Sequence, residues 1–287
     1  MWILFSIIAG MFLAPAYILT KKLSDTYEKG YGRFIMTVGL ASAPFALLGL
    51  LSIGKPFGLV VVLGGMIYGY SISLFYRSMG MPTVSAFVAA TVGQLIPAVI
   101  AVMAWQLLDE PMTTSELIAF GVMIIGSLIT AISKSNVKSS LKGLALLLLS
   151  VVLTSSYNVL LKYGRNEGAL SGWELFTLTR LGMVLTFIGF LLTPARRKLM
   201  SFFELRNNTK MLFIGNECMF LTFNWLFALA VAMQVNKNVA LASAIYFSAN
   251  QTLLFLHSVA RKKDTNIVRK AIGALLALTG LVYIALH

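Results

Sequence analysis

The sequence predicts an all-α polytopic membrane protein with ten transmembrane helices, arranged as two inverted five-helix repeats. Three observations lead to this prediction: the apolar composition, a series of apolar runs as long as a bilayer is thick, and weak similarity between the two halves. Of the 287 residues, 58% are apolar and 11% are charged, whereas soluble domains carry roughly 25% charged residues. The chain is therefore not expected to form one water-exposed globule.

Apolar runs of about 20 residues, the length that crosses a hydrocarbon core of about 30 Å, recur along the whole sequence. No connection between them is long enough for a soluble domain. The expected spans are residues 2–20, 32–53, 58–80, 83–108, 114–133, 142–162, 172–193, 211–233, 238–258 and 267–286. The first run has no basic residue before it and is followed by Lys21 and Lys22, so we expect a retained transmembrane helix rather than a signal peptide.

Small residues recur within these runs at helix-packing spacing and predict close contacts between helices. Glycine and alanine are common in membrane helices, so some of these pairs are expected to have no packing role. The pairs are Gly65 with Gly69, Gly10 with Ala14, Gly39 with Ala43, and Gly121 with Gly126.

Three short segments recur in the same order in the two halves, about 140–152 residues apart. They are "YILTKK" from Tyr17 and "YNVLLK" from Tyr157, "RFIMTVG" from Arg33 and "RLGMVLTF" from Arg180, and "LFYRSM" from Leu74 and "LFALAV" from Leu226. Together they predict two repeats, residues 1–137 and 138–287. Because five is odd, the second repeat must enter the membrane from the opposite side, an architecture that encloses a central site and supports alternating access.

The formal net charge is +13. Basic residues are interleaved with the spans and form no separate domain, so we expect membrane lipids and not nucleic acid as partners. Lysine and arginine are concentrated in the connections that follow odd-numbered spans, whereas Lys55, Arg165 and Lys237 are nearly all that the other connections hold. By the positive-inside rule, both termini are expected outside.

The stretch "MPTVSAFVAATVGQLIPAVIAVMAWQLLDEPMTTSELIAFGVMIIGSLITA" resembles the signature of the EamA-like transporters of the drug/metabolite transporter superfamily. The matching residues are Pro82, Ser85, Ala89, Ala90, Pro97, Asp109, Glu110, Gly121 and Gly126, with Arg33 and Arg180 where each repeat often carries an arginine. In the second half the pattern departs, because Asn250 stands where Pro97 would repeat and residues 261–264 replace the acidic turn. The family usually has cytoplasmic termini, contrary to the charge distribution.

The resemblance implies a secondary active transporter, working as an exporter, that moves a small metabolite such as an amino acid, a sugar or a nucleotide. It also implies the cell membrane of a bacterium or archaeon, and a monomer or homodimer. The alternatives are a flippase for a lipid-linked substrate, a membrane enzyme, or a non-transporting membrane protein.

Glu217 is the acidic residue that lies well inside an expected span, roughly 9 Å deep at 1.5 Å per residue. It could titrate and couple protons to transport, bind a cationic substrate, or pair with an arginine and fix helix packing. Arg180, about 20 Å deep, could be that partner or could hold a substrate carboxylate or phosphate.

The remaining candidates for substrate binding are polar or aromatic residues within the spans. Asn224 shares the helical face of Glu217, and Tyr246 and Asn250 share one face with Ser243. They could line a cavity or make hydrogen bonds between helices. The substrate-binding set is Glu217, Arg180, Asn224, Tyr246, Asn250, Gln94, Tyr157 and Tyr76.

No catalytic pattern is present. Cys218 is the only cysteine, His257 and His287 are far apart, and the sequence has no phosphate-binding Walker A loop. We therefore expect no enzymatic activity, no cofactor and no metal site.

Overall fold

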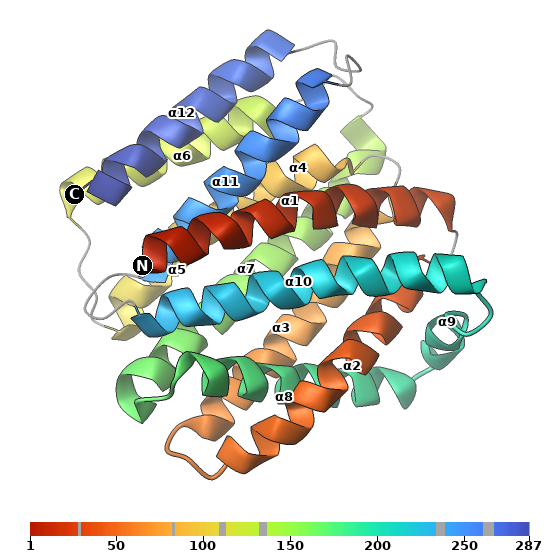
Figure 1. Cartoon of the computed structure of the whole chain (residues 1–287). Coiled ribbons are helices and arrows are strands. Elements are labelled where there is room, and N and C mark those ends of the chain that lie inside the picture. The colour runs from red at the N-terminus through yellow and green to blue at the C-terminus, as the bar shows by residue number, and fades with distance from the viewer. Residues whose placement is uncertain are drawn as a thin grey trace.

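The computed structural model describes residues 1–27, 30–81, 84–108, 113–131, 137–233, 239–260 and 267–286. Within these residues the regular secondary structure is entirely helical (Figure 1). The α-helices are α1 (Trp2–Thr26), α2 (Gly30–Gly49), α3 (Gly58–Met79), α4 (Ala86–Gly93), α5 (Leu95–Leu108), α6 (Thr114–Ala131), α7 (Val137–Gly168), α8 (Gly172–Leu191), α9 (Arg196–Met200), α10 (Asn207–Met233), α11 (Val239–Ala260) and α12 (Ile267–Leu286). A 3₁₀ turn, Leu50–Ser52, extends α2.

Seven helical segments in the described chain are long and apolar enough to cross a bilayer. They are Trp2–Thr26, Gly30–Ser52, Gly58–Met79, Val88–Leu108, Leu141–Gly168, Gly172–Leu191 and Asn207–Met233. A shorter apolar stretch, Ala271–Gly280, lies in α12. The prediction of a multi-pass helical membrane protein is confirmed, while the full count of ten spans stays a prediction.

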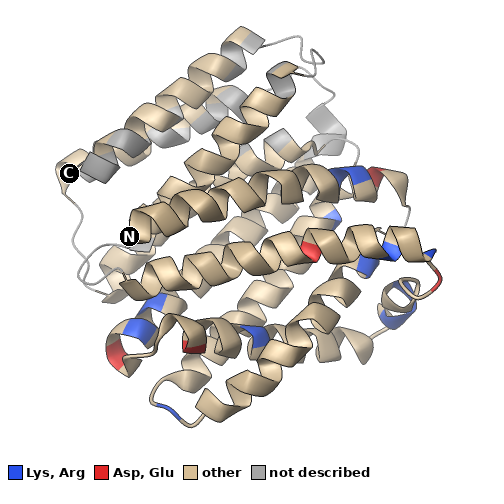
Figure 2. Cartoon of the chain, in the orientation of Figure 1, with Lys and Arg blue, Asp and Glu red and all other residues tan. Residues whose placement is uncertain are grey.

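Charged positions lie near helix ends and in connections, and some also lie within helices (Figure 2). Arg180 is inside α8 and Glu217 is inside α10. The expected motif residues Pro82, Asp109 and Glu110, and residues 261–264, lie outside the described part of the chain. Lysines 29, 134 and 237, which entered the charge count, also lie outside it.

The helices pack in pairs that join the two halves of the sequence. α1 packs against α10 and α11, α3 packs against α7 and α8, and α2 packs against α8. α6 and α12 lie side by side at one edge of the bundle (Figure 1).

Glycines bring α3 and α8 to close approach. A Cβ added at Gly65 would lie 2.9 Å from the Cα of Thr179, and one added at Gly182 would lie 2.6 Å from the amide nitrogen of Met66. Such distances leave no room for a side chain on either residue. The predicted packing role is confirmed for Gly65.

Of four other glycines predicted to pack closely, three contact a neighbouring helix within the described chain and one does not. Gly69 packs against α8, Gly39 against the ring of Phe187, and Gly10 against α11, so the predicted packing role is also found at these three positions. Gly121, in contrast, has no described atom within 4 Å of the position that a Cβ would take.

The helix over residues 86–108 is broken at Gln94, between α4 and α5. Pro97 explains the position, because it has no N–H to donate to the carbonyl of Gly93 four residues earlier. At the start of α8, Ser171 and Glu174 form a capping box, in which each side chain accepts from the other's backbone N–H. Lys55, between α2 and α3, pairs with the same Glu174 carboxylate.

Candidate functional site

A central cavity of about 60 Å³ lies among the helices. It is bounded by α1, α3, α7, α10, α11 and the broken α4–α5 pair. The described lining residues are Leu13, Tyr17, Tyr68, Ser71, Ile72, Phe75, Ala89, Val92, Gly93, Ile96, Leu147, Ser150, Val151, Thr154, Tyr157, Asn158, Phe220, Phe223, Asn224, Phe227, Tyr246 and Phe247. A cavity of this volume holds a few water molecules, so a larger ligand requires the wall to open.

The lining is aromatic and uncharged. Nine of its described residues are Phe or Tyr, and none of them is Lys, Arg, Asp or Glu. The rings of Tyr68 and Tyr157 are stacked with centroids 4.4 Å apart. On α11, Tyr246 meets Phe223 and Phe227 edge-on at 5.0 and 5.2 Å.

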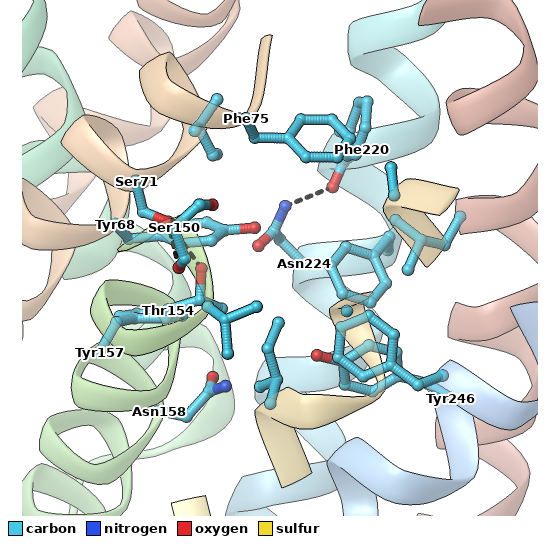
Figure 3. Close-up of a pocket in the computed structure, with 18 of the residues that line it drawn as sticks. Tyr68, Ser71, Phe75, Ser150, Thr154, Tyr157, Asn158, Phe220, Asn224 and Tyr246 are labelled. Atoms are coloured by element: carbon cyan, nitrogen blue, oxygen red, sulfur yellow. Dashed lines mark hydrogen bonds between the residues drawn. The ribbon is translucent and has the colours of Figure 1, made fainter. Parts of the chain in front are cut away.

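Hydroxyl groups on one wall of the cavity satisfy one another. The Ser71 hydroxyl on α3 lies 2.9 Å from that of Ser150 and 2.7 Å from that of Thr154, both on α7 (Figure 3). It also donates to the Ser150 carbonyl at 2.8 Å. Because the Ser71 hydroxyl donates to that carbonyl, the Ser150 and Thr154 hydroxyls donate to Ser71, so that all three donors are used while the Ser150 and Thr154 oxygens can still accept.

Two amide side chains of the lining each have a polar atom without a hydrogen-bond partner among the described residues. Asn224 donates to the Phe220 carbonyl at 2.6 Å, but its Oδ1 makes no hydrogen bond within the described chain. Nδ2 of Asn158 likewise has no partner among the described residues. Both residues are buried, and Figure 3 shows them among the residues that line the cavity.

The lining positions of α3 and α10 correspond one to one. On α3 they are 68, 71, 72 and 75, and on α10 they are 220, 223, 224 and 227. Each α10 position follows its α3 counterpart by 152 residues, the separation of "LFYRSM" and "LFALAV". The two helices therefore present the same face to the cavity.

Next to the cavity, four buried side chains from four helices form what we call the charge cluster: Ser42, Tyr76, Arg180 and Glu217. Nη1 of Arg180 lies 3.6 Å from Oε1 of Glu217 and donates to the Ser42 hydroxyl at 3.3 Å. The Tyr76 hydroxyl donates to Oε2 of Glu217 in a long hydrogen bond of 3.5 Å. The cluster links α2, α3, α8 and α10.

The Arg180 guanidinium is only partly satisfied. Its Nε and Nη2 have no hydrogen-bond partner within the described chain. Its carbon atom Cζ lies 5.1 Å from the ring centroid of Phe176, a cation–π contact that compensates in part.

The eight predicted substrate residues fall into three groups. Tyr157, Asn224 and Tyr246 line the cavity. Tyr76, Arg180 and Glu217 form the charge cluster, and the direct pair between the last two answers a question that the sequence left open. Gln94 and Asn250 are buried but are not among the residues that line the cavity.

The sequence did not single out most of the aromatic wall. Tyr17 could have been found, because it is the repeat counterpart of Tyr157, and Asn158 follows Tyr157 directly. By contrast, the aromatic residues Tyr70, Trp105, Trp173 and Trp225 lie exposed on the outer surface of the bundle.

Comparison with known proteins identifies the fold and no family. No protein-family model matches the sequence, and no curated protein does. By structure, 28 chains of solved structures match. One, described as "Crystal structure of protein", is 14% identical, covers 99% of this chain and 95% of its own, and has a TM-score of 0.66. The protein is thus a multi-pass helical membrane protein whose fold recurs in a solved structure.

Proposed function

We propose that this protein is a secondary active transporter of the EamA-like type, which exports a small metabolite by alternating access. The observation that carries the proposal is the central cavity, bounded by the first, third and fourth helices of both predicted repeats. A cavity at the interface of two inverted repeats is where secondary transporters bind their substrates.

The packing supports the two-repeat architecture. If the halves are exchanged, α1 takes the place of α7 and α3 takes the place of α10. The contact of α1 with α10 then becomes the contact of α7 with α3, and both contacts are present. The pairs α2–α8 and α6–α12 each convert into themselves and are also present.

A pair of basic side chains supports the same relation. At the end of α1, Lys21 donates to the carbonyls of Met79 and Met81, at and just beyond the end of α3. At the end of α7, Arg165 donates to the carbonyl of Ala232 at the end of α10. In each half, a cation from the first helix therefore caps the third helix, where the helix dipole favours positive charge.

One departure from symmetry supports alternating access. α3 packs on α8 much more extensively than α10 packs on α2, although the two pairs are counterparts. Inverted repeats open a central site to one side when their halves adopt different conformations. Unequal packing of the two pairs is therefore expected in a state of the transport cycle in which the cavity opens to one side of the membrane.

The charge cluster supports a packing role for Glu217 within this function. Its carboxylate contacts Arg180 and Tyr76 and does not line the cavity. Because an intramembrane charge is expensive unless it is paired, the cluster fixes the meeting point of α2, α3, α8 and α10. Coupling to protons would then have to break the pair.

Counterflow in proteoliposomes tests the proposal. Purified protein is reconstituted in liposomes preloaded with unlabelled amino acids, sugars, nucleosides or neutral aromatic amides, and uptake of the labelled compound is followed. Uptake above that of protein-free liposomes is expected for at least one compound. Absence of counterflow for every compound, with protein that remains folded after extraction, would overturn the transport function.

A further inference from the structure

The residues that line the cavity limit the chemical class of ligand that it can bind. The inference rests on the proposed function only because this ligand is taken to be the substrate. We propose that the cavity binds an uncharged, planar aromatic molecule that carries a carboxamide or lactam group. Once the wall has opened to admit it, the ring would lie between the aromatic walls, and the amide would form hydrogen bonds with the side chains of Asn224 and Asn158.

The walls favour a flat ring. Tyr17, Phe75 and Phe220 group on one side, where Tyr17 lies 4.9 Å from Phe75 and 6.3 Å from Phe220 between ring centroids. Phe223 and Tyr246 belong to a second group, 5.0 Å apart. Aromatic rings bind other rings at centroid separations of 4.5–7 Å, by offset stacking or edge-to-face contact.

The free polar atoms favour an amide. Oδ1 of Asn224 can accept a hydrogen bond and Nδ2 of Asn158 can donate one, and neither has a partner within the described chain. Both belong to buried residues of the lining, on α10 and α7. A carboxamide or lactam carries one N–H donor and one carbonyl acceptor, which matches this pair.

The surrounding charge disfavours an ionised ligand. No described lining residue carries a charge that could neutralise a carboxylate, a phosphate or an ammonium group, and an unpaired ion is costly to bury.

Benzamide is the simplest probe of this chemistry, and three compounds of similar size serve as comparisons. Benzoate replaces the amide with a carboxylate, benzyltrimethylammonium replaces it with a cation that has no donor or acceptor, and cyclohexanecarboxamide keeps the amide but removes the aromatic ring. Binding of radiolabelled benzamide to the purified protein in detergent is measured by equilibrium dialysis against empty micelles, and the other compounds compete with it.

We expect benzamide to bind at least tenfold more tightly than each of the three analogues. The variant Asn224→Leu is expected to weaken benzamide binding about tenfold, because the carbonyl acceptor of the site is lost. Thr222→Val, on the same helix but outside the lining, is the control and should bind as the wild type does. Asn158→Leu repeats the test on α7, in case Asn224→Leu does not fold.

Failure of this inference is distinguishable from failure of the transport function. Absence of benzamide binding, equal or tighter binding of benzoate or the cation, or unchanged affinity in both asparagine variants would each overturn the ligand class. Counterflow of a charged compound would then leave the transporter proposal standing. Benzamide binding without any counterflow would support the ligand class and overturn transport.

Discussion

The Arg180 guanidinium and the Glu217 carboxylate lie 3.6 Å apart, buried between α8 and α10. Removing one partner of a buried ion pair leaves the other charge uncompensated and typically costs about 3–5 kcal/mol. We therefore expect Glu217→Gln to lower the thermal unfolding temperature of the detergent-solubilised protein markedly. The double variant Arg180→Met with Glu217→Met should recover most of that loss, since no unpaired charge remains.

Cys218 provides the control for this experiment, because it follows Glu217 directly but is exposed. Cys218→Ser should melt as the wild type does. A Glu217→Gln protein with wild-type stability would show that the pair does not hold the helices together.

The close approach of α3 and α8 predicts sensitivity to a single methyl group. Gly182→Ala would place its Cβ 2.6 Å from the amide nitrogen of Met66, and overpacking of this kind costs about 1–3 kcal/mol. A lower unfolding temperature is expected. Gly189→Ala, on the same helix, has no atom of the described chain within 4 Å of the new Cβ and should be neutral. Equal effects of the two substitutions would contradict the packing.

The helix boundaries could be predicted because apolar runs of bilayer length end where polar residues begin. The ten expected spans overlap helical segments of the described chain, and residues 58–80 correspond to Gly58–Met79. Within the described chain, the differences between the expected spans and the observed helices are confined to individual helix ends and one helix break. α7 extends to Gly168, six residues beyond the expected end at 162, although residues 163–168 include two glycines. The break at Gln94 lies three residues before the proline that causes it.

The rotation of each helix could not be predicted, and the cavity depends on it. In water, one apolar face marks the core. In a bilayer, the lipid-facing side is apolar as well, so the positions of apolar residues do not show which face of a helix points into the bundle. Asn224 lines the cavity while Trp225, the next residue, is exposed on the outer surface. Only the repeat, through equivalent positions on α3 and α10, carried information about the inward face.

Lys21 is predicted to stabilise the end of α3. It donates to the carbonyls of Met79 and Met81 at 3.2 and 3.1 Å, and hydrogen bonds to a charged group contribute about 1.5–3 kcal/mol. Lys21→Met should therefore lower the unfolding temperature. Lys22→Met removes the same charge from an exposed neighbour and is expected to have little effect. If both variants melt alike, the cap contributes nothing.

Asn224→Asp tests the uncharged character of the cavity from the opposite direction. The substitution keeps the size of the side chain but places a carboxylate where no described lining residue is charged. If benzamide is a ligand, its affinity should fall about tenfold while that of benzyltrimethylammonium rises, because the cation now has a partner. Equilibrium dialysis with both compounds measures the two affinities in the variant and in the wild type. Unchanged preference would mean that Asn224 does not contact the ligand.

The distribution of basic residues predicts the orientation of the protein in the membrane. The connection around α9 carries Arg196, Arg197 and Lys198, whereas the connection between α2 and α3 carries Lys55. The positive-inside rule places the α9 side in the cytoplasm. With Cys218 replaced by serine, single cysteines at the exposed positions Gly54 and Glu204 report the two sides. A membrane-impermeant maleimide should label Gly54→Cys in intact cells and Glu204→Cys only after permeabilisation. The reverse pattern would give the orientation usual for EamA-like transporters and would show that charge does not set the topology of this chain.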